Sequence, residues 1–285
     1  MKLFFIIRNC IKLISLGLSL GKGFKSDTVV ILMYHRVRGD SGLELDIKEN
    51  VFSRQMEWLE KHTNIVSIND LLSSTTTCEK VDGKSKGKLR IVLTFDDAYE
   101  DFYTNVWPIL KKLEIPAVLY TPTQYIENPE VVPLSKIPEC NSKFLPVTWD
   151  MLAEMNKCPL VTIGAHSHTH REFPSLSSRE ISEEIAISDQ IFQERLGFHP
   201  SHFAYPRGAW NERCEQVIDK RYESIALVSG GGIGIDKLDP LRLPRVPVLK
   251  SDQFWWFRHR VMGRLGLEEK IIGMMRRFLQ ERRGR

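Results

Sequence analysis

The stretch IVLTFDDAY, residues 91–99, joins a short run of apolar, β-prone residues directly to two adjacent aspartates. Similar apolar runs lie on either side of it along the chain, TVVILMY at 28–34 and AVLYT at 117–121, and segments with helical spacing separate the runs. Strands that alternate with helices favour a parallel sheet, in which the chemistry lies at the C-terminal ends of the strands. Asp96 and Asp97 occupy such an end, so this stretch indicates both the fold class and the place of a site.

The same alternation of predicted strands and helices continues along the central part of the chain. A helix that begins after Ser177 is the clearest, because Ser177 and Glu180 form a capping box and Gly197 supplies a stop. The polar segment 73–88 reads as a solvated loop, and the proline-rich segment 122–147 as a long insertion that serves as a lid or substrate loop. Further strands are expected at 65–68, 160–164, 202–205, 224–228 and 245–248. About seven parallel strands with outer helices predict an α/β barrel or a doubly wound sheet.

The composition is that of one large globular domain with basic extensions. The 285 residues are 42% hydrophobic and 27% charged, which argues against disordered, collagenous and disulfide-scaffold classes. The formal net charge is +4 for residues 1–27, −5 for 28–250 and +5 for 251–285. An anionic lipid surface is therefore the expected partner of the two ends, and no nucleic-acid module is present in the sequence. The cysteines are odd in number, lack C-x-x-C spacing and indicate no disulfide framework: Cys10, Cys78, Cys140, Cys158 and Cys214.

Residues 1–27 are expected to form a basic amphipathic segment at a membrane interface. Arg8, Lys12, Ser15 and Ser19 recur along one face of a helix, and apolar residues cover the other side. In a spanning helix Arg8 and Lys12 would each cost roughly 2.5 to 3.5 kcal/mol in the hydrocarbon layer, so a helix lying flat on the surface is favoured. A signal peptide or anchor and an ordinary packing helix are the alternatives.

Residues 251–285 show a related pattern. Trp255 and Trp256 are followed by Arg258 and Arg260, an arrangement that is typical of membrane–water interfaces. Further apolar residues at helical spacing predict a basic amphipathic helix: Val261, Leu265, Ile272, Met275 and Leu279. A terminal helix packed on its own domain is the alternative.

A second group of polar residues, AHSHTH at 165–170, follows the apolar run 160–164. His166 and His170 lie four residues apart and share a face if the segment makes one helical turn. Together with one carboxylate they form a three-ligand set that leaves positions open, as in catalytic metal sites. His168 is expected to point elsewhere, with a role as ligand or neighbour of a ligand as the alternative.

The third motif, FAYPRG at 203–208, reads alone as a structural turn whose proline and glycine can direct a backbone N–H into a pocket. The order of the three motifs resembles the polysaccharide deacetylase family, carbohydrate esterase family 4. TFDD, then an H-[ST]-x-x-H element, then an aromatic-Pro-x-Gly turn is that family's order. ILMYHRV at 31–37 and LPRVPV at 243–248 resemble its bacterial branch that handles surface glycans. The resemblance covers roughly residues 28–250.

The resemblance implies a metal-dependent carbohydrate N-deacetylase, and we expect a distorted (β/α) barrel of about seven parallel strands with outer helices. It makes Asp97, His166 and His170 the ligands of a divalent metal, with zinc as the default ion. It makes Asp96 the general base that takes a proton from the water attacking the acetamide. All four residues are present, which favours an enzyme over a non-catalytic carbohydrate-binding relative or a membrane scaffold.

The sequence departs from the common family pattern at three places. A Leu-x-Ile-His element that carries the acid is absent from the sequence, so His35 in the N-terminal Tyr-His element is the implied acid, with a structural histidine as the alternative. The third motif has Ala204 and Arg207 where an arginine and an aromatic residue are common. The backbone N–H of Arg207 would still hold the oxyanion. Arg245 is expected to orient Asp96 instead.

The two basic ends bear on the substrate and on the location of the protein. They favour an N-acetylhexosamine on a polyprenyl carrier, presented at an anionic membrane surface, with a capsular or matrix glycan as the alternative. Hydrolysis of a non-sugar amide by the same site is a third hypothesis for the reaction. The expected location is the periphery of a bacterial inner membrane, on either face.

Overall fold

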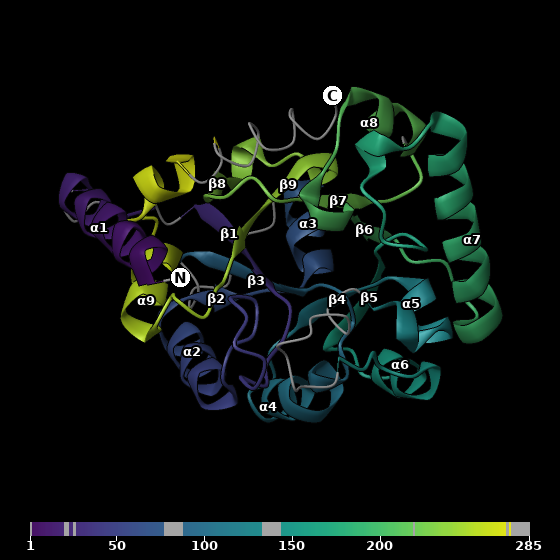
Figure 1. Ribbon diagram of the computed structural model, residues 1–285, viewed down its shortest axis with the longest axis horizontal. Coiled ribbons are helices and arrows are strands. Elements are labelled where there is room, and N and C mark those ends of the chain that lie inside the picture. The colour runs from purple at the N-terminus through teal and green to yellow at the C-terminus, as the bar shows by residue number, and fades with distance from the viewer. Residues whose placement is uncertain are drawn as a thin grey trace.

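The computed structural model describes residues 2–19, 23–24, 27–76, 88–132, 144–218, 220–271 and 274. Within them, seven parallel strands close into a barrel (Figure 1), because the last strand in the order pairs again with the first. The barrel order is β1 (Thr28–Tyr34), β3 (Arg90–Phe95), β4 (Ala117–Thr121), β5 (Val161–Ala165), β6 (His202–Ala204), β7 (Ser224–Leu227) and β9 (Leu243–Pro247). The expected distorted (β/α) barrel is confirmed, and the doubly wound sheet is not found.

The register of the strands brings the predicted site residues to one end of the barrel. β1 and β3 pair from Val29–Arg90 to Tyr34–Phe95, so both strands end at the same level. The residues that follow them, His35 and Asp96, therefore emerge side by side. Both strands are buried on both faces, as parallel strands are, which explains why they read as continuous apolar runs.

The interior of the barrel is a packed core that opens only at this end. Val29 and Ile31 of β1 point inward among small and branched residues of the other strands, with Ile68 and Leu71 of α3 (Ile68–Thr76) in the same cluster. Met33, next on the inward side of β1, lines a pocket instead. The barrel is therefore filled at its N-terminal end and hollow at its C-terminal end, as the fold class predicts.

Helices cover the outside of the barrel (Figure 1): α2 (Glu49–His62), α4 (Trp107–Lys112) after the π-helical turn η1 (Phe102–Val106), α5 (Thr123–Glu127), α6 (Trp149–Asn156), α7 (Ser178–Leu196) and α8 (Glu212–Ile218). The capping box predicted for α7 is present. Ser177 N donates to Glu180 Oε2 at 2.8 Å, and Gly197 adopts a φ of 78° at the C-cap. Both ends of the helix therefore lie where the sequence indicated.

Three expectations about local structure were wrong or only partly met. The expected strand 65–68 is limited to β2 (Asn64–Ile65), because Ser67 Oγ accepts from Asp70 N and starts α3 at Ile68. The same helix extends to Thr76 through the start of the expected loop 73–88, of which residues 77–87 lie outside the described residues, as does Cys78. The expected insertion 122–147 contains α5 and the 3₁₀ turn η2 (Pro129–Val131), and its residues 133–143, which include Cys140, are not described.

The N-terminal helix α1 (Lys2–Leu18) is present, but its polar stripe faces the protein. Arg8 and Lys12 are buried and form ion pairs with Asp252, and Arg8 also binds Glu268 at 2.7 Å. The expectation of a free basic face was therefore wrong for these two cations. Acidic partners near the other end of the chain offset the cost of burying them.

The C-terminal segment joins the main domain. The helix α9 (Phe254–Val261) contributes Phe257 and Val261 to the main core cluster, and a helical stretch follows at 266–271. The expected apolar positions at Ile272, Met275 and Leu279 lie outside the described residues. Among the described helices, none has the length and apolar character needed to cross a membrane.

Candidate active site

A pocket of about 380 Å³ occupies the C-terminal mouth of the barrel. It is lined by residues that follow several different strands: Met33, His35, Leu45, Asp96, Asp97, Tyr99, Tyr125, His166, His170, Arg207 and Val228. Six of the seven predicted site residues are among them, and the seventh, Arg245, contacts Asp96. The residues that follow the strand ends therefore line, or contact a residue that lines, one pocket.

Asp97, His166 and His170 converge on one point. One ligand atom from each lies within 4.8 Å of the others, and the two histidine Nε2 atoms are 3.2 Å apart. Asp97 Oδ1 is 3.1 Å from His170 Nε2 and 3.7 Å from His166 Nε2. His168 is not part of the group, because its Nδ1 lies 2.9 Å from Thr123 Oγ1.

The histidines meet through an irregular turn and not through the helical turn that the spacing suggested. Ser167 and His170 both have positive φ values, 63° and 60°, and Ser167 Oγ accepts from His170 N at 3.0 Å. Glu184 of α7 accepts hydrogen bonds from the backbone N–H groups of His168 and Thr169. The outer helix α7 therefore holds the turn that presents the two imidazoles.

The donor set suits a metal ion. His166 Nδ1 lies 2.7 Å from the carbonyl oxygen of Ala204, which can only accept, so Nδ1 carries the proton and Nε2 keeps its lone pair. Burial lowers the pKa of His166 to about 4, so the ring is neutral at physiological pH. Asp97 Oδ1 is buried without a hydrogen bond of regular geometry to any described residue. A cation would satisfy this oxygen and both imidazoles at once.

Electrostatics keep Asp97 ionised as well. Burial alone would raise the pKa of its carboxyl, but the neighbouring charge of His170 outweighs burial and holds the pKa well below its usual range. Asp97 itself has a φ of 69°, a left-handed conformation that non-glycine residues seldom adopt. Such backbone strain is common at functional sites, where the surrounding structure enforces it.

Asp96 is held by an arginine from β9, the strand that flanks β1 on the side opposite β3. Arg245 Nη1 donates to Asp96 Oδ1 at 2.5 Å and Nη2 to Oδ2 at 2.8 Å, and the Arg245 side chain is fully buried. Burial would raise the pKa of Asp96, but the charge of Arg245 lowers it below the ordinary value. The contact expected between these two residues is present, and Asp96 is a carboxylate at neutral pH.

His35 and Arg207 complete the rim of the pocket. His35 Nδ1 is buried and has no hydrogen-bond partner among the described residues. Arg207 has a φ of 57° inside the 3₁₀ turn η5 (Pro206–Gly208), and its half-exposed side chain lies 3.5 Å from Glu172. The structure therefore places both residues at the pocket, while their assigned roles as acid and oxyanion donor stay predictions.

Two tyrosines line the pocket that the motifs did not identify. Tyr99 follows the aspartate pair, and Tyr125 of α5 has its ring centroid 5.5 Å from that of His170. Tyr125 belongs to the segment 122–147, which the sequence predicted to be an insertion that serves as a lid or substrate loop. That prediction was the one sequence signal for a role of Tyr125 at the pocket. Both rings can pack against a bound sugar.

The fold is a parallel α/β barrel. At its mouth lie two imidazoles and one carboxylate that could hold a metal ion, beside a second carboxylate that an arginine holds. Residues 83–221 match the family model described as polysaccharide deacetylase. This part of the chain is similar to the polysaccharide deacetylase family, as the order of the motifs indicated.

Two curated relatives illustrate the similarity. A putative polysaccharide deacetylase of Bacillus subtilis is 25% identical over 190 residues, which cover 67% of this chain and 60% of the relative. A poly-beta-1,6-N-acetyl-D-glucosamine N-deacetylase of Escherichia coli is 26% identical over 264 residues, which cover 82% of this chain and 38% of the relative. The chain thus spans less than two thirds of the length of these two relatives.

Solved structures share the fold. A deacetylase from Streptococcus pyogenes, determined with acetate, superposes with a TM-score of 0.66 at 20% identity and covers 84% of this chain and 99% of its own. IcaB from Ammonifex degensii superposes with a TM-score of 0.67 at 20% identity and covers 85% of this chain and 98% of its own. At this identity the two structures bear on the fold alone.

Proposed function

We propose that the chain is a metal-dependent carbohydrate N-deacetylase that hydrolyses the acetamide of N-acetylhexosamine units in a bacterial surface glycan. One observation carries the proposal: Asp97, His166 and His170 converge beside the arginine-held carboxylate of Asp96 in a single pocket. The relatives named as poly-beta-1,6-N-acetyl-D-glucosamine N-deacetylases support the substrate class.

Asp97, His166 and His170 are the residues that would hold the metal. A set of two imidazoles and one carboxylate suits zinc and leaves positions open for substrate and water. When bound, the ion supplies a Lewis acid that polarises the acetamide carbonyl and lowers the pKa of water. His166 contributes a neutral nitrogen to this set because the carbonyl of Ala204 fixes its tautomer.

The remaining residues handle the protons and the developing charge. Asp96 takes a proton from the attacking water, and Arg245 keeps that carboxylate ionised and oriented. The backbone N–H of Arg207 donates to the oxyanion that forms on the carbonyl oxygen. His35 donates a proton to the departing nitrogen as the carbon–nitrogen bond breaks. The products are acetate and the free amino sugar.

The exposed surface of the molecule bears on the finer substrate and on the location. The exposed side of α1 is apolar, with Leu13, Ile14 and Leu18 each more than half exposed, and Trp255 of α9 is also exposed. This surface supports an anionic membrane as partner, the periphery of a bacterial inner membrane as location, and a polyprenyl-linked N-acetylhexosamine as substrate. A surface polymer is the competing substrate, and Arg8 and Lys12 contribute nothing to lipid binding because they are buried.

Acetate release tests the proposal. The purified chain is stripped with a chelator, reloaded with zinc, and assayed on N-acetylglucosamine oligomers, on a polyprenyl-linked N-acetylhexosamine and on a simple non-sugar acetamide. Zinc-dependent acetate release from a sugar substrate is expected, and the two sugar arms decide between polymer and lipid-linked precursor. Release from the simple acetamide alone would show that the substrate is not a sugar.

A further inference from the structure

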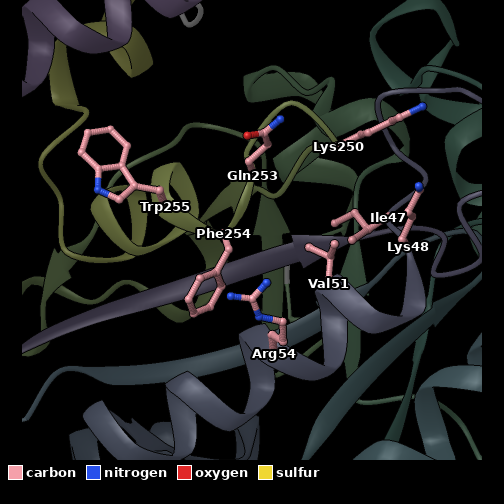
Figure 2. Close-up of a pocket in the computed structure, with 8 residues that line it drawn as sticks. All are labelled: Ile47, Lys48, Val51, Arg54, Lys250, Gln253, Phe254 and Trp255. Carbon is pink, nitrogen blue, oxygen red and sulfur yellow. The ribbon is translucent and has the colours of Figure 1, made fainter.

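A second hollow lies outside the active pocket, between the start of α2 and the start of α9. It has a volume of about 590 Å³ and shares no residue with the active pocket. Figure 2 shows its lining: Ile47, Lys48, Val51, Arg54, Lys250, Gln253, Phe254 and Trp255. We call it the α2–α9 groove.

The lining combines positive charge with apolar and aromatic surface. Lys48, Arg54 and Lys250 are cations, and none of the described residues that line the groove is acidic. None of the three forms an ion pair with a residue that the structure describes, although Arg54 lies 4.6 Å from the centre of the Phe254 ring. Cations that lack a carboxylate partner and stand beside aromatic rings suit a ligand with a phosphate group and an apolar body.

The α2–α9 groove is linked to α1 through two tryptophans of α9. The Trp255 ring packs edge-on against Trp256 with centroids 4.5 Å apart, and Lys12 Nζ of α1 lies 5.5 Å from the centre of the Trp256 ring. On the exposed side of α1, Leu13 and Ile14 are 58% and 56% exposed, and Leu18 is 68% exposed. We call these three residues the α1 ridge. The helices that carry the α1 ridge and line the groove, α1, α2 and α9, lie toward the same end of the molecule (Figure 1).

We propose that the α2–α9 groove binds the headgroup phosphate of an anionic phospholipid while the α1 ridge inserts among the acyl chains of the same bilayer. This inference rests on the proposed membrane partner and assigns the site that contacts it. Charge favours this occupant, because three unpaired cations flank the groove and the inserted ridge carries none. The ridge then supplies a share of binding that salt does not screen.

The groove also has a defined relation to the active pocket. Leu45 lines the active pocket, and Ile47, two residues later, lines the groove. The segment 45–47 thus borders both hollows. Docking through the groove would bring the mouth of the barrel close to the lipid headgroups, where a glycan attached to a lipid carrier is presented.

Vesicle binding by the full chain tests the inference. The groove variant Lys48→Gln/Arg54→Gln/Lys250→Gln and the ridge variant Leu13→Ser/Leu18→Ser are compared on phosphatidylcholine vesicles with and without phosphatidylglycerol. Each cation near an anionic surface is worth about fivefold in affinity, so the groove variant should bind phosphatidylglycerol vesicles about 100-fold more weakly. The ridge variant should lose the binding that persists at high salt.

Matched controls come from α7, at the opposite end of the molecule (Figure 1). Arg179→Gln removes a cation that is 89% exposed, and Ile187→Ser removes an apolar side chain that is 42% exposed. Both should bind vesicles as the unaltered chain does. If the groove variant binds phosphatidylglycerol vesicles like the unaltered chain, or if the α7 variants lose as much affinity, the assignment is wrong.

Two further readouts separate this inference from the proposed catalysis. Acetate release from a soluble sugar should be unchanged in the groove variant, because no groove residue lines the active pocket. Vesicle binding without acetate release from any sugar would leave the membrane site standing and remove the proposed activity. Binding of inorganic phosphate without binding to vesicles would instead identify a small-anion site and overturn the membrane inference.

Discussion

Arg245 and Asp96 form a bidentate ion pair, with nitrogen–oxygen distances of 2.5 and 2.8 Å, although they lie 149 residues apart in the chain. Arg245 comes from β9, and Asp96 follows β3. A planar guanidinium fixes the plane of the carboxylate as well as its charge. Arg245 is therefore a positioning residue for the proposed base.

Substitution of Arg245 should separate the effect of its positive charge on acetate release from the effect of its planar, two-pronged hydrogen bonding. Arg245→Lys keeps a positive charge but loses the planar fork, and Arg245→Met loses both. Acetate release should fall in both variants, by at least about 100-fold in Arg245→Met, because a misoriented base loses most of its catalytic advantage. Bound metal, measured by elemental analysis, should stay at the level of the unaltered chain. Acetate release by Arg245→Lys at the level of the unaltered chain would argue against a role for the fork.

The metal assignment predicts different behaviour for two histidines in the same turn. His170→Ala removes a ligand, so it should reduce bound metal and abolish acetate release while circular dichroism shows a folded chain. His168→Ala is the matched control, because His168 contacts Thr123 and lies outside the triad. It should retain the metal. Full metal occupancy in His170→Ala would show that His170 is not a metal ligand.

The N-terminal helix should contribute to stability through its buried cations. Lys12 is fully buried and donates to Asp252 Oδ1 at 2.7 Å. Lys12→Met leaves that carboxylate short of a partner, so the free energy of unfolding should fall by about 3 kcal/mol in urea titrations. Leu13→Ser, one residue away and exposed, should change it by less than about 0.5 kcal/mol. Equal effects would contradict the docked position of α1.

Removal of both ends of the chain should also lower the free energy of unfolding. A chain without residues 1–24 and 258–285 lacks Arg8, Lys12 and Arg260, the three cations that pair with Asp252. It also lacks Val261 of the main core cluster. Loss of vesicle binding by such a truncated chain would therefore report unfolding as well as detachment, which is why single exposed residues are the better probes.

Stability should depend on pH through Glu269. Burial raises the pKa of its carboxyl from 4.5 to about 7, even though Arg260 Nη1 lies 3.5 Å away. Between these pH values the folded chain holds a proton that the unfolded chain has released, so the free energy of unfolding falls as the pH rises. Glu269→Gln removes this dependence. It should match the unaltered chain near pH 4.5 and exceed it by up to about 3 kcal/mol at pH 8. Parallel stability profiles for the two proteins would contradict the shift.

The barrel and the convergence of Asp97, His166 and His170 were predictable from sequence for a physical reason. Buried parallel strands are continuous apolar runs, and functional side chains follow them directly, as Asp96 follows β3 and His166 follows β5. Local motifs therefore carried most of the information about the site. The capping box of α7 was predictable from sequence for the same reason, since its two residues lie three apart in the chain.

Other features depend on contacts that no local pattern encodes. The polar stripe of α1 has the same sequence pattern whether it faces water or buried acidic residues. Asp252, which pairs with Lys12 and so places this stripe against the protein, lies 240 residues from Lys12. Similarly, positive φ values at Ser167 and His170 bring the histidines together, and residue spacing alone suggested a helical turn. Tyr125 reaches the pocket through the placement of α5, which its surrounding sequence does not reveal.

The central claim is that Asp96 acts as the base beside a metal held by other residues, and Asp96→Asn tests it most directly. Acetate release and bound metal are measured on the same preparation of this variant and of the unaltered chain. The account predicts metal at the level of the unaltered chain and acetate release lower by at least about 100-fold. Acetate release near that of the unaltered chain from the metal-loaded variant would contradict it.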